Sequence, residues 1–529
     1  MKELPIGVST FESIIANNLL YVDKTEILYQ LITGGPKRYF FSRPRRFGKS
    51  LTCSTLNAIF SGKKELFKNL WIGSSDYAWQ VHPIISFDFS GISHKTPEAL
   101  IKGLYSAINA HAKKYDITLQ EESLKERFAE LIIEIGKIHG PVVILVDEYD
   151  KPITNLIDNI DQVHASQTEL KEFYGTLKNA DVDANMYFLF VTGVSKFSKV
   201  ALFSDLNNLQ DLTNDPLAAK LVGYTDNEVD TYLSEHIQAF ADDSKESYTD
   251  MRNTLKKWYN GYRFTPLNST VYNPFSLHNC LTIKFLDNYW FSSGTPTFLL
   301  KFIKKNPIIA TDIESIEGSF FAQTNLNSFS VDVYYKNYRT LLLQTGYLTF
   351  ASDYDPGRRG YLIGYPNEEV RYSMTEQIMQ YVGGITPDQF GEFGNRFKQA
   401  LLTDNIGLFC KHMQDFIKLI PHDIRVDLEK FYQQTFFMIC VLFGKRPASE
   451  VATEEGFMDL LLEGTACTFI VEFKKNSTPE IALAQIEKKR YWEPFEILKT
   501  KKVVLAGITF NKTNLGTEVL YKTKEISIT

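Results

Sequence analysis

The chain has 529 residues, of which 44% are hydrophobic, 23% charged and 14% aromatic, and its formal net charge is −6. At about 100–200 residues per domain, this length predicts about two to four domains, and the composition is ordinary for soluble globular protein. The acidic balance excludes a whole-chain basic footprint for nucleic-acid binding, although a local basic patch is compatible with it.

The first part of the chain, residues 1–223, alternates short apolar strands with helices. The run PVVILVDEYD is nearly continuous in β-branched residues, which is typical of a strand buried on both faces of a parallel sheet. Strands alternating with helices predict an α/β sheet. The strands are expected at 38–42, 84–89, 141–150 and 185–193, and the helices at 97–114 and 120–138.

The pattern changes twice after this region. Residues 224–400 are expected to be mostly helical, and residues 401–529 form a third region that opens with a strong amphipathic helix at 426–443. The element order in the third region is α-β-β-β-α-β. Its strands are expected at 448–453, 457–463, 467–474 and 502–510, with a helix at 479–495.

The loop after the first strand reads Arg-Pro-Arg-Arg-Phe-Gly-Lys-Ser over residues 43–50. Gly48, Lys49 and Ser50 match the end of the phosphate-binding pattern G-x-x-x-x-G-K-[ST], and Arg43 occupies the position of its first glycine. Such a loop turns backbone N–H groups and a helix N-terminus toward phosphate oxygens. Lys49 would pair with the β- and γ-phosphates, and the Ser50 hydroxyl would bind Mg²⁺. A surface turn is the alternative for a lone GKS.

A second pair of residues supports nucleotide binding. Asp147 and Glu148 end an apolar strand, as in a Walker B motif, so Asp147 would hold Mg²⁺ and Glu148 would polarise the attacking water. Thr192 ends the next strand, where a polar residue can sense the γ-phosphate, and Ser195 is a second candidate for this role; a simple Thr-Gly turn explains Thr192 equally well. Arg45 and Arg46 either contact phosphate or another subunit, or form a solvated loop face.

Residues 1 to about 350 resemble the AAA-ATPase-like family found in many bacterial genomes. The resemblance rests on YVDKTEILYQLI (21–32), FFSRPRRFGKSLTCSTL (40–56) and VILVDEYDKPI (143–153), and continues through FVTGVSKFS, LNNLQDLT, WYNGYRF and WFSSGTPTFL. Arg43 in place of the first glycine is itself similar to the family. The resemblance implies ATP and Mg²⁺ as cofactors. The expected nucleotide contacts are Arg46, Phe47, Gly48, Lys49, Ser50, Leu51, Asp147 and Thr192.

A carboxylate and lysine constellation marks the C-terminal region. Asp459 begins one strand, and Glu472 and Lys474 end the next, on the same face of the sheet because they are two residues apart. Hairpin geometry can place Asp459 beside them. Two carboxylates with the Phe473 carbonyl would hold Mg²⁺, and Lys474 would act on the attacking water. The alternative is a surface salt-bridge cluster, although charge within the apolar strand TFIVEF would be costly without partners.

Residues 450–510 resemble the PD-(D/E)XK nuclease-like domain that commonly follows this ATPase family. The resemblance implies catalytic roles for Asp459, Glu472 and Lys474, and a weaker metal-ligand role for Glu450. Many relatives have Arg where this chain has Phe457. The other matching positions are Gly456, Ala482, Gln485, Lys489 and Tyr491.

Basic residues near this motif form either a phosphate-backbone track or an ordinary solvated helix face. The nine histidines show no HxH or HExxH spacing and are assigned no ligand role. The basic residues are Lys474, Lys475, Lys488, Lys489, Arg490, Lys499, Lys501 and Lys502.

We expect a cytoplasmic protein. No apolar run reaches the roughly 18–20 residues that span a bilayer, and the N-terminus lacks the apolar stretch of a signal peptide. Scattered cysteines without CxxC spacing suit a reducing compartment. The cysteines are Cys53, Cys280, Cys410, Cys440 and Cys467.

These observations predict an ATP-binding and ATP-hydrolysing protein with a Mg²⁺-dependent nuclease domain that acts on nucleic acid, DNA more than RNA, in a possible homo-oligomer. One alternative is a regulatory ATPase switch whose C-terminal domain binds nucleic acid or protein without cutting. A second alternative is a non-enzymatic interaction protein that holds nucleotide structurally.

Overall fold

The structure is a computed structural model that falls into two compact units. The N-terminal unit contains Met1–Phe298 and Gly318–Val370, and the C-terminal unit contains Arg371–Thr529. Among the described residues, no helix combines the length and apolar character needed to cross a membrane. The described residues are 1–156, 159–196, 203, 208–265, 267–294, 318–326, 338–383, 386–419, 429–442, 447–453, 456–493, 502–514 and 516–526.

The N-terminal unit is built on a parallel sheet with the strand order β2-β3-β4-β1-β5. The strand β4 lies between β1, which leads into the phosphate-binding loop, and β3, which ends in Asp147. The predicted α/β fold class and its four strands are confirmed, and β5 is an addition. The strands are β1 Arg38–Ser42, β2 Ile84–Asp88, β3 Val142–Asp147, β4 Met186–Gly193 and β5 Gln210–Asp211.

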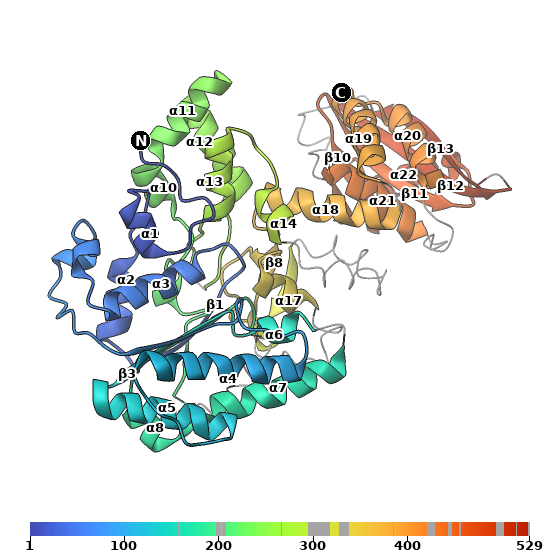
Figure 1. Ribbon diagram of the computed structural model, residues 1–529. Helices are drawn as coiled ribbons and strands as arrows, with labels where there is room; N and C mark the ends of the chain where they lie inside the picture. The colour runs from blue at the N-terminus through green and yellow to red at the C-terminus, as the bar shows by residue number, and fades with distance from the viewer. Residues whose placement is uncertain are drawn as a thin grey trace. The chain divides into compact units, whose positions relative to one another are not determined.

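Helices cover both faces of this sheet. The helix α3 packs on β3 and β4, while α4, α5 and α7 pack together on the other side (Figure 1). Every residue of β1 and most of β3 and β4 are buried, as expected for strands covered on both faces. The helices here are α1 Phe11–Ala16, α2 Thr25–Thr33, α3 Lys49–Phe60, α4 Pro97–Lys114, α5 Leu124–His139, α6 Lys151–Thr154, α7 Ile160–Gly175 and α8 Ala180–Ala184.

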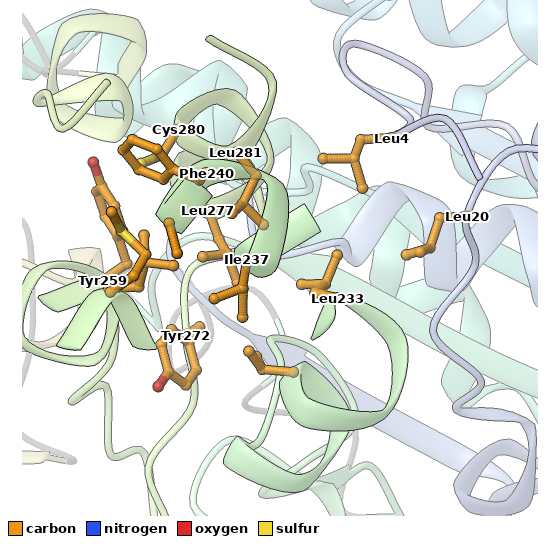
Figure 2. Packing of buried hydrophobic residues seen from close by; sticks show 14 of the residues in the cluster. Leu4, Leu20, Leu233, Ile237, Phe240, Tyr259, Tyr272, Leu277, Cys280 and Leu281 are labelled. Atoms are coloured by element: carbon orange, nitrogen blue, oxygen red, sulfur yellow. The ribbon is translucent and has the colours of Figure 1, made fainter. Parts of the chain in front are cut away.

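The expected middle region, 224–400, begins with helices that share a core with the start of the chain. Figure 2 shows Leu4 and Leu20 packed in one cluster with side chains of α11, α12 and α13. The boundary between the two units falls at Val370, so the expected boundaries at 223 and 400 do not coincide with it. These helices are α10 Asp226–Tyr232, α11 Ser234–Ser244, α12 Tyr248–Tyr259, α13 Pro274–Ile283, α14 Tyr289–Gly294 and α17 Tyr338–Thr345.

The N-terminal unit also contains a small antiparallel sheet that periodicity did not predict. Its order is β6-β8-β7, and its strands have only two to five residues, too short for an alternating pattern to stand out. The strands are β6 Ser319–Ala322, β7 Thr349–Phe350 and β8 Gly360–Gly364.

The C-terminal unit is a five-stranded mixed sheet with the order β13-β12-β11-β10-β9. The strands β11 and β12 are parallel, and α22 connects them; the other pairs are antiparallel. The helix α22 packs on one face of β11 and β12, where a Cβ at Gly507 would lie 2.3 Å from the Pro479 carbonyl oxygen. Only glycine therefore allows the helix this approach.

The predicted α-β-β-β-α-β order is confirmed in this unit. The helix α22 is shorter than expected because the chain turns at Arg490, whose φ is 47°, and β13 was not predicted. Residues 426–428, 443 and 494–495 of the expected helices lie outside the described residues. The elements are α18 Glu368–Gly383, α19 Pro387–Leu402, α20 Ile406–Leu419, α21 Glu429–Leu442, β9 Ala448–Thr453, β10 Gly456–Glu463, β11 Cys467–Lys475, α22 Pro479–Lys489, β12 Lys502–Thr513 and β13 Gly516–Ile526.

Candidate nucleotide-binding and nuclease sites

The phosphate-binding loop joins β1 to α3. Arg46 at φ 64° and Gly48 at φ 107° both have left-handed backbone conformations, and Gly48 is the N-cap of α3. Within the described chain, the backbone N–H groups of Gly48, Lys49, Ser50 and Leu51 donate to no backbone carbonyl. Unsatisfied N–H groups in a turn at a helix N-terminus make an anion-binding nest. The geometry of the loop is compatible with phosphate groups, and phosphate binding stays a prediction.

Arg43 does not take part in this nest. Its guanidinium is fully buried, 4.5 Å from the ring centroids of Phe41 and Phe264, and donates to the carbonyls of Ser42, Thr213 and Ala218. Burial lowers the pKa of Arg43 to about 9, although Asp211 opposes this effect. Arg43 therefore joins the start of the loop to the segment after β5, and its position in the motif is structural.

Lys49 lies among the loop carbonyls and three acidic groups. Its Nζ donates to the carbonyl oxygens of Arg43 and Pro44, at 2.9 Å each. Burial lowers the pKa of Lys49, and the charges of Asp147 and Glu148 oppose that change. A buried ammonium with only carbonyl acceptors gains strongly from an anionic partner, because charge-assisted hydrogen bonds are stronger than neutral ones.

The two Walker B carboxylates have different partners. Asp147 accepts a hydrogen bond of 2.5 Å from the Thr192 hydroxyl, so the predicted neighbour at the end of β4 lies beside Asp147. Glu148 has φ 55° and forms an ion pair of 2.6 Å with Lys151. Glu148 must leave this pair, or share it, before it can act on water. The roles of these residues in hydrolysis stay predictions.

Asp150 is a third acidic residue of the motif, and sequence reasoning did not single it out. It is buried and accepts hydrogen bonds from the backbone N–H groups of Val194 and Ser195 and from the Ser195 hydroxyl at 2.9 Å. Burial raises the pKa of Asp150, and these donors oppose the change. Ser195 thus ties the end of β4 to the segment after β3.

A cavity of about 430 Å³ opens beside the loop. Its lining includes all six predicted loop contacts from Arg46 to Leu51, and Glu148, but not Asp147 or Thr192, which bond to one another. This volume falls in the range typical of small-molecule and cofactor sites, about 300–1,000 Å³. The cavity also uses residues 5–9 and α13, whose participation no local motif could indicate.

The candidate nuclease residues converge at the ends of β10 and β11. Leu460 pairs with Val471 in the antiparallel register, which brings the ends carrying Asp459 and Glu472 together. Asp459 Oδ2 accepts from the Phe473 backbone N–H at 2.8 Å, and Lys474 Nζ is 2.8 Å from Glu472 Oε1. The predicted juxtaposition of Asp459, Glu472 and Lys474 is therefore present.

Glu472 is 1% exposed, and its two oxygens differ in their contacts. Oε1 accepts from Lys474 and from the Gln485 amide, whereas Oε2 is buried and has no hydrogen-bond partner among the described residues. Burial raises the pKa of Glu472 to about 7, and the charge of Asp459 contributes to the rise. A divalent cation would satisfy Oε2 and offset the repulsion, so Asp459 and Glu472 fit Mg²⁺. No described group of three or more His, Cys, Asp or Glu is arranged for a metal.

Further residues border this site. Glu429, at the start of α21, accepts from the Lys475 backbone N–H at 2.8 Å and adds to the rise in the pKa of Glu472. Sequence reasoning missed it, because only the fold brings α21 to the end of β11. The side chain of Glu450, the weaker candidate ligand, lies outside the described residues. Tyr491 donates from its hydroxyl to the Phe457 carbonyl at 2.7 Å.

Two family models and one relative match this chain. A family model described as "Predicted AAA-ATPase" matches residues 5–203, and one described as "PD-(D/E)XK nuclease superfamily" matches residues 427–518. The uncharacterized protein in vnfD 5′region of Azotobacter chroococcum mcd 1 is 31% identical over 523 residues, which is 97% of each chain. This chain belongs to the AAA-ATPase-like family with a C-terminal PD-(D/E)XK nuclease superfamily domain.

A solved structure of the Aeropyrum pernix ORC1 protein in complex with DNA is also similar. The match covers 69% of this chain and 92% of the ORC1 chain, with 11% sequence identity and a TM-score of 0.23. A likeness at this level carries no argument about function. The family of this AAA-ATPase-like protein is shown by the two family models and by the relative in Azotobacter chroococcum mcd 1.

Three of the predicted basic residues lie in ion pairs. Lys474 pairs with Glu472, Arg490 pairs with Glu493, and Lys502 pairs with Glu525 at 2.6 Å. Lys499 and Lys501 lie outside the described residues. The choice between a phosphate track and a solvated face stays a prediction. Phe457, where many relatives have Arg, is 66% exposed.

Proposed function

We propose that this protein binds and hydrolyses ATP in its N-terminal unit and cleaves nucleic acid, DNA more than RNA, in its C-terminal unit with Mg²⁺. The observation that carries the nuclease proposal is the convergence of Asp459, Glu472 and Lys474 around a buried carboxylate oxygen without a partner. Two carboxylates and a lysine at the ends of adjacent strands suit metal-assisted phosphodiester hydrolysis.

In the C-terminal unit, Asp459 and Glu472 would hold Mg²⁺ together with the Phe473 carbonyl oxygen. Bound Mg²⁺ would polarise the phosphodiester and lower the pKa of a coordinated water. Lys474 now donates to Glu472 and to the Phe473 carbonyl at 3.0 Å. Its Nζ can therefore hold these ligand atoms in place and orient water beside them. Gln485 fixes the other hydrogen bond to Glu472 Oε1.

In the N-terminal unit, the N–H groups of residues 46–51 and Lys49 would bind the phosphates. Ser50 and Asp147 would hold Mg²⁺, Asp147 directly or through water, with its Oδ1 held by the Thr192 hydroxyl. Glu148 would polarise the attacking water once its pair with Lys151 opens.

The test is cleavage of labelled single- and double-stranded DNA and RNA with Mg²⁺ or Mn²⁺, with and without ATP. Lys474→Ala should abolish cleavage, whereas Lys522→Ala, an exposed lysine paired with Glu480, should not. Lys49→Ala reports whether ATP controls cleavage, with the exposed Lys63→Ala as its control. Cleavage that survives Lys474→Ala would refute the assigned site.

A second candidate is a regulatory ATPase switch that binds nucleic acid or protein without cutting. The net charge of −6 and Phe457, where many relatives have Arg, favour it. Intact ATP hydrolysis with no cleavage under any metal condition would support this function. A third candidate, nucleotide held as a structural element, would be favoured by bound ATP without turnover and no effect of Glu148→Gln.

A further inference from the structure

Phe457 exposes its aromatic ring to solvent near the start of β10. Its side chain is 66% exposed, whereas Met458 and Leu460 of the same strand are each 1% exposed. Within the described chain, the ring stacks on no other aromatic ring. A single exposed apolar side chain is ordinary on a protein surface, so the meaning of Phe457 depends on the groups that surround it.

The ring of Phe457 lies on the face of the sheet that carries the candidate nuclease residues. The strand β10 keeps one register with β9 from Gly456 to Leu461, so its side chains alternate regularly between the two faces. Phe457 and Asp459 are two residues apart and therefore share a face. At a rise of about 3.3 Å per residue, their Cα atoms are about 7 Å apart. A base whose phosphate lies at Asp459 is within reach of the ring.

The backbone of Phe457 is fixed next to this site. The hydroxyl of Tyr491 donates to the Phe457 carbonyl at 2.7 Å, and Tyr491 itself is buried. Burial raises the pKa of Tyr491, and the charges of Glu472 and Asp459 add to the rise, so the tyrosine borders both carboxylates. The ring therefore projects from a rigid strand whose position relative to the site is set by a buried hydrogen bond.

A cationic group stands beside the ring. A Cβ built at Gly456 would lie 3.4 Å from Lys489 Nζ, which places this ammonium group next to the residue that precedes Phe457. Proteins bind single-stranded nucleic acid with this combination, because cations follow the phosphate backbone while aromatic rings stack on the bases.

Stacking on Phe457 requires a base with an open face. In a duplex, the neighbouring base pairs cover both faces of each base, whereas the bases of a single strand can be splayed apart and stacked on side chains. Every base has an aromatic face, so a phenyl ring accepts all four without reading the sequence.

We propose that Phe457 stacks on a base next to the phosphodiester held at Asp459 and Glu472, and that the C-terminal unit therefore prefers single-stranded nucleic acid to duplex. The inference rests on the proposed nuclease function and adds its substrate class. Phe457 is a specificity residue, because it contacts the substrate away from the reacting atoms.

The experiment measures binding by the full-length protein of three labelled DNA ligands of equal length, by fluorescence anisotropy. The ligands are a single strand, its duplex, and a single strand with abasic sites, which keeps the phosphates and lacks the bases. Ca²⁺ replaces Mg²⁺, and a gel checks that each ligand stays intact. Phe457→Leu should weaken binding of the single strand by about 10-fold and leave the other two ligands unchanged.

Two further variants separate stacking from loss of apolar volume. Phe457→Trp keeps an aromatic face and should bind the single strand at least as tightly as the wild type. Tyr521→Leu is the matched control, because Tyr521 is an exposed aromatic residue of β13, which two strands separate from β10, and it should change no affinity.

Each result decides the proposal. Equal weakening of all three ligands by Phe457→Leu would overturn it, as would no weakening of any. Wild-type protein that binds duplex as tightly as single strand would refute the substrate class and leave the nuclease proposal standing. Binding of no ligand would refute the proposed action on nucleic acid, and this inference with it. The expected binding pattern without cleavage in Mg²⁺ would support stacking and refute only the nuclease activity.

Discussion

The raised pKa of Glu472 predicts a pH-dependent metal affinity in the C-terminal unit. Its pKa lies at about 7 against an ordinary value of 4.5, because the carboxylate is buried and faces Asp459. This difference corresponds to about 3 kcal/mol that disfavours the charged form in the folded protein. A cation binds the charged form, so protons compete with the metal below pH 7.

The magnitude follows from the fraction of Glu472 that is ionised. Lowering the pH from 8 to 6 reduces that fraction about 10-fold for a pKa of about 7, and the dissociation constant for Mn²⁺ should rise about 10-fold. The raised pKa of Glu472 also sets the direction in which folding stability changes with pH. The unfolded chain loses this proton at a lower pH than the folded chain, so stability without metal should fall by up to about 3 kcal/mol as pH rises from about 4.5 to 7.

The assay is calorimetric titration of Mn²⁺ at pH 6, 7 and 8 in the Asp147→Asn background, which removes the carboxylate of the proposed metal site in the N-terminal unit. Glu472→Gln should abolish the strong binding and its pH dependence. Glu480→Gln, an exposed glutamate on α22 paired with Lys522, is the control and should change neither. Affinity that is constant from pH 6 to 8, or a dependence that persists in Glu472→Gln, would refute the reasoning.

Three further predictions concern the N-terminal unit. Gly48→Ala should weaken ATP binding by about 10-fold, because a φ of 107° costs an L-residue about 1–2 kcal/mol. The control is Gly140→Ala, which is also at positive φ and should leave ATP affinity unchanged. Equal ATP affinity in the two variants would contradict this prediction. Arg43→Met should lower unfolding stability by about 3 kcal/mol, because buried carbonyls lose their donors, and an unchanged melting temperature would count against the structural role. Thr192→Val removes the hydrogen bond to Asp147, so it should lower folding stability by about 1 kcal/mol and slow ATP hydrolysis while ATP still binds. An unchanged rate of ATP hydrolysis would exclude a role for the Thr192–Asp147 bond.

Local sequence was enough to predict the parts of each site that lie within one strand, loop or helix terminus. The phosphate-binding loop follows from β1, Gly48 and α3, which are contiguous, and Glu472 and Lys474 share a face because strands have a two-residue period. Asp459 followed from a short hairpin, whose register fixes its partner strand. Short strands such as β5, and the polar strand β13, gave no periodic pattern strong enough to predict.

Long-range packing decided the remaining features, because it depends on which distant segments bury the same apolar surface. It brings Glu429 of α21 to the candidate nuclease residues and His278 of α13 to the cavity beside the phosphate-binding loop, and neither stands in a motif. It also gives Arg43 a structural role, since its partners Thr213 and Ala218 lie about 170 residues away in sequence. Sequence by itself therefore determined the fold class and where the two motifs stand in the chain, and the chemistry of those motifs stays a prediction. Tertiary structure decided which distant residues complete each site, since only the packed chain sets their burial and the charges around them.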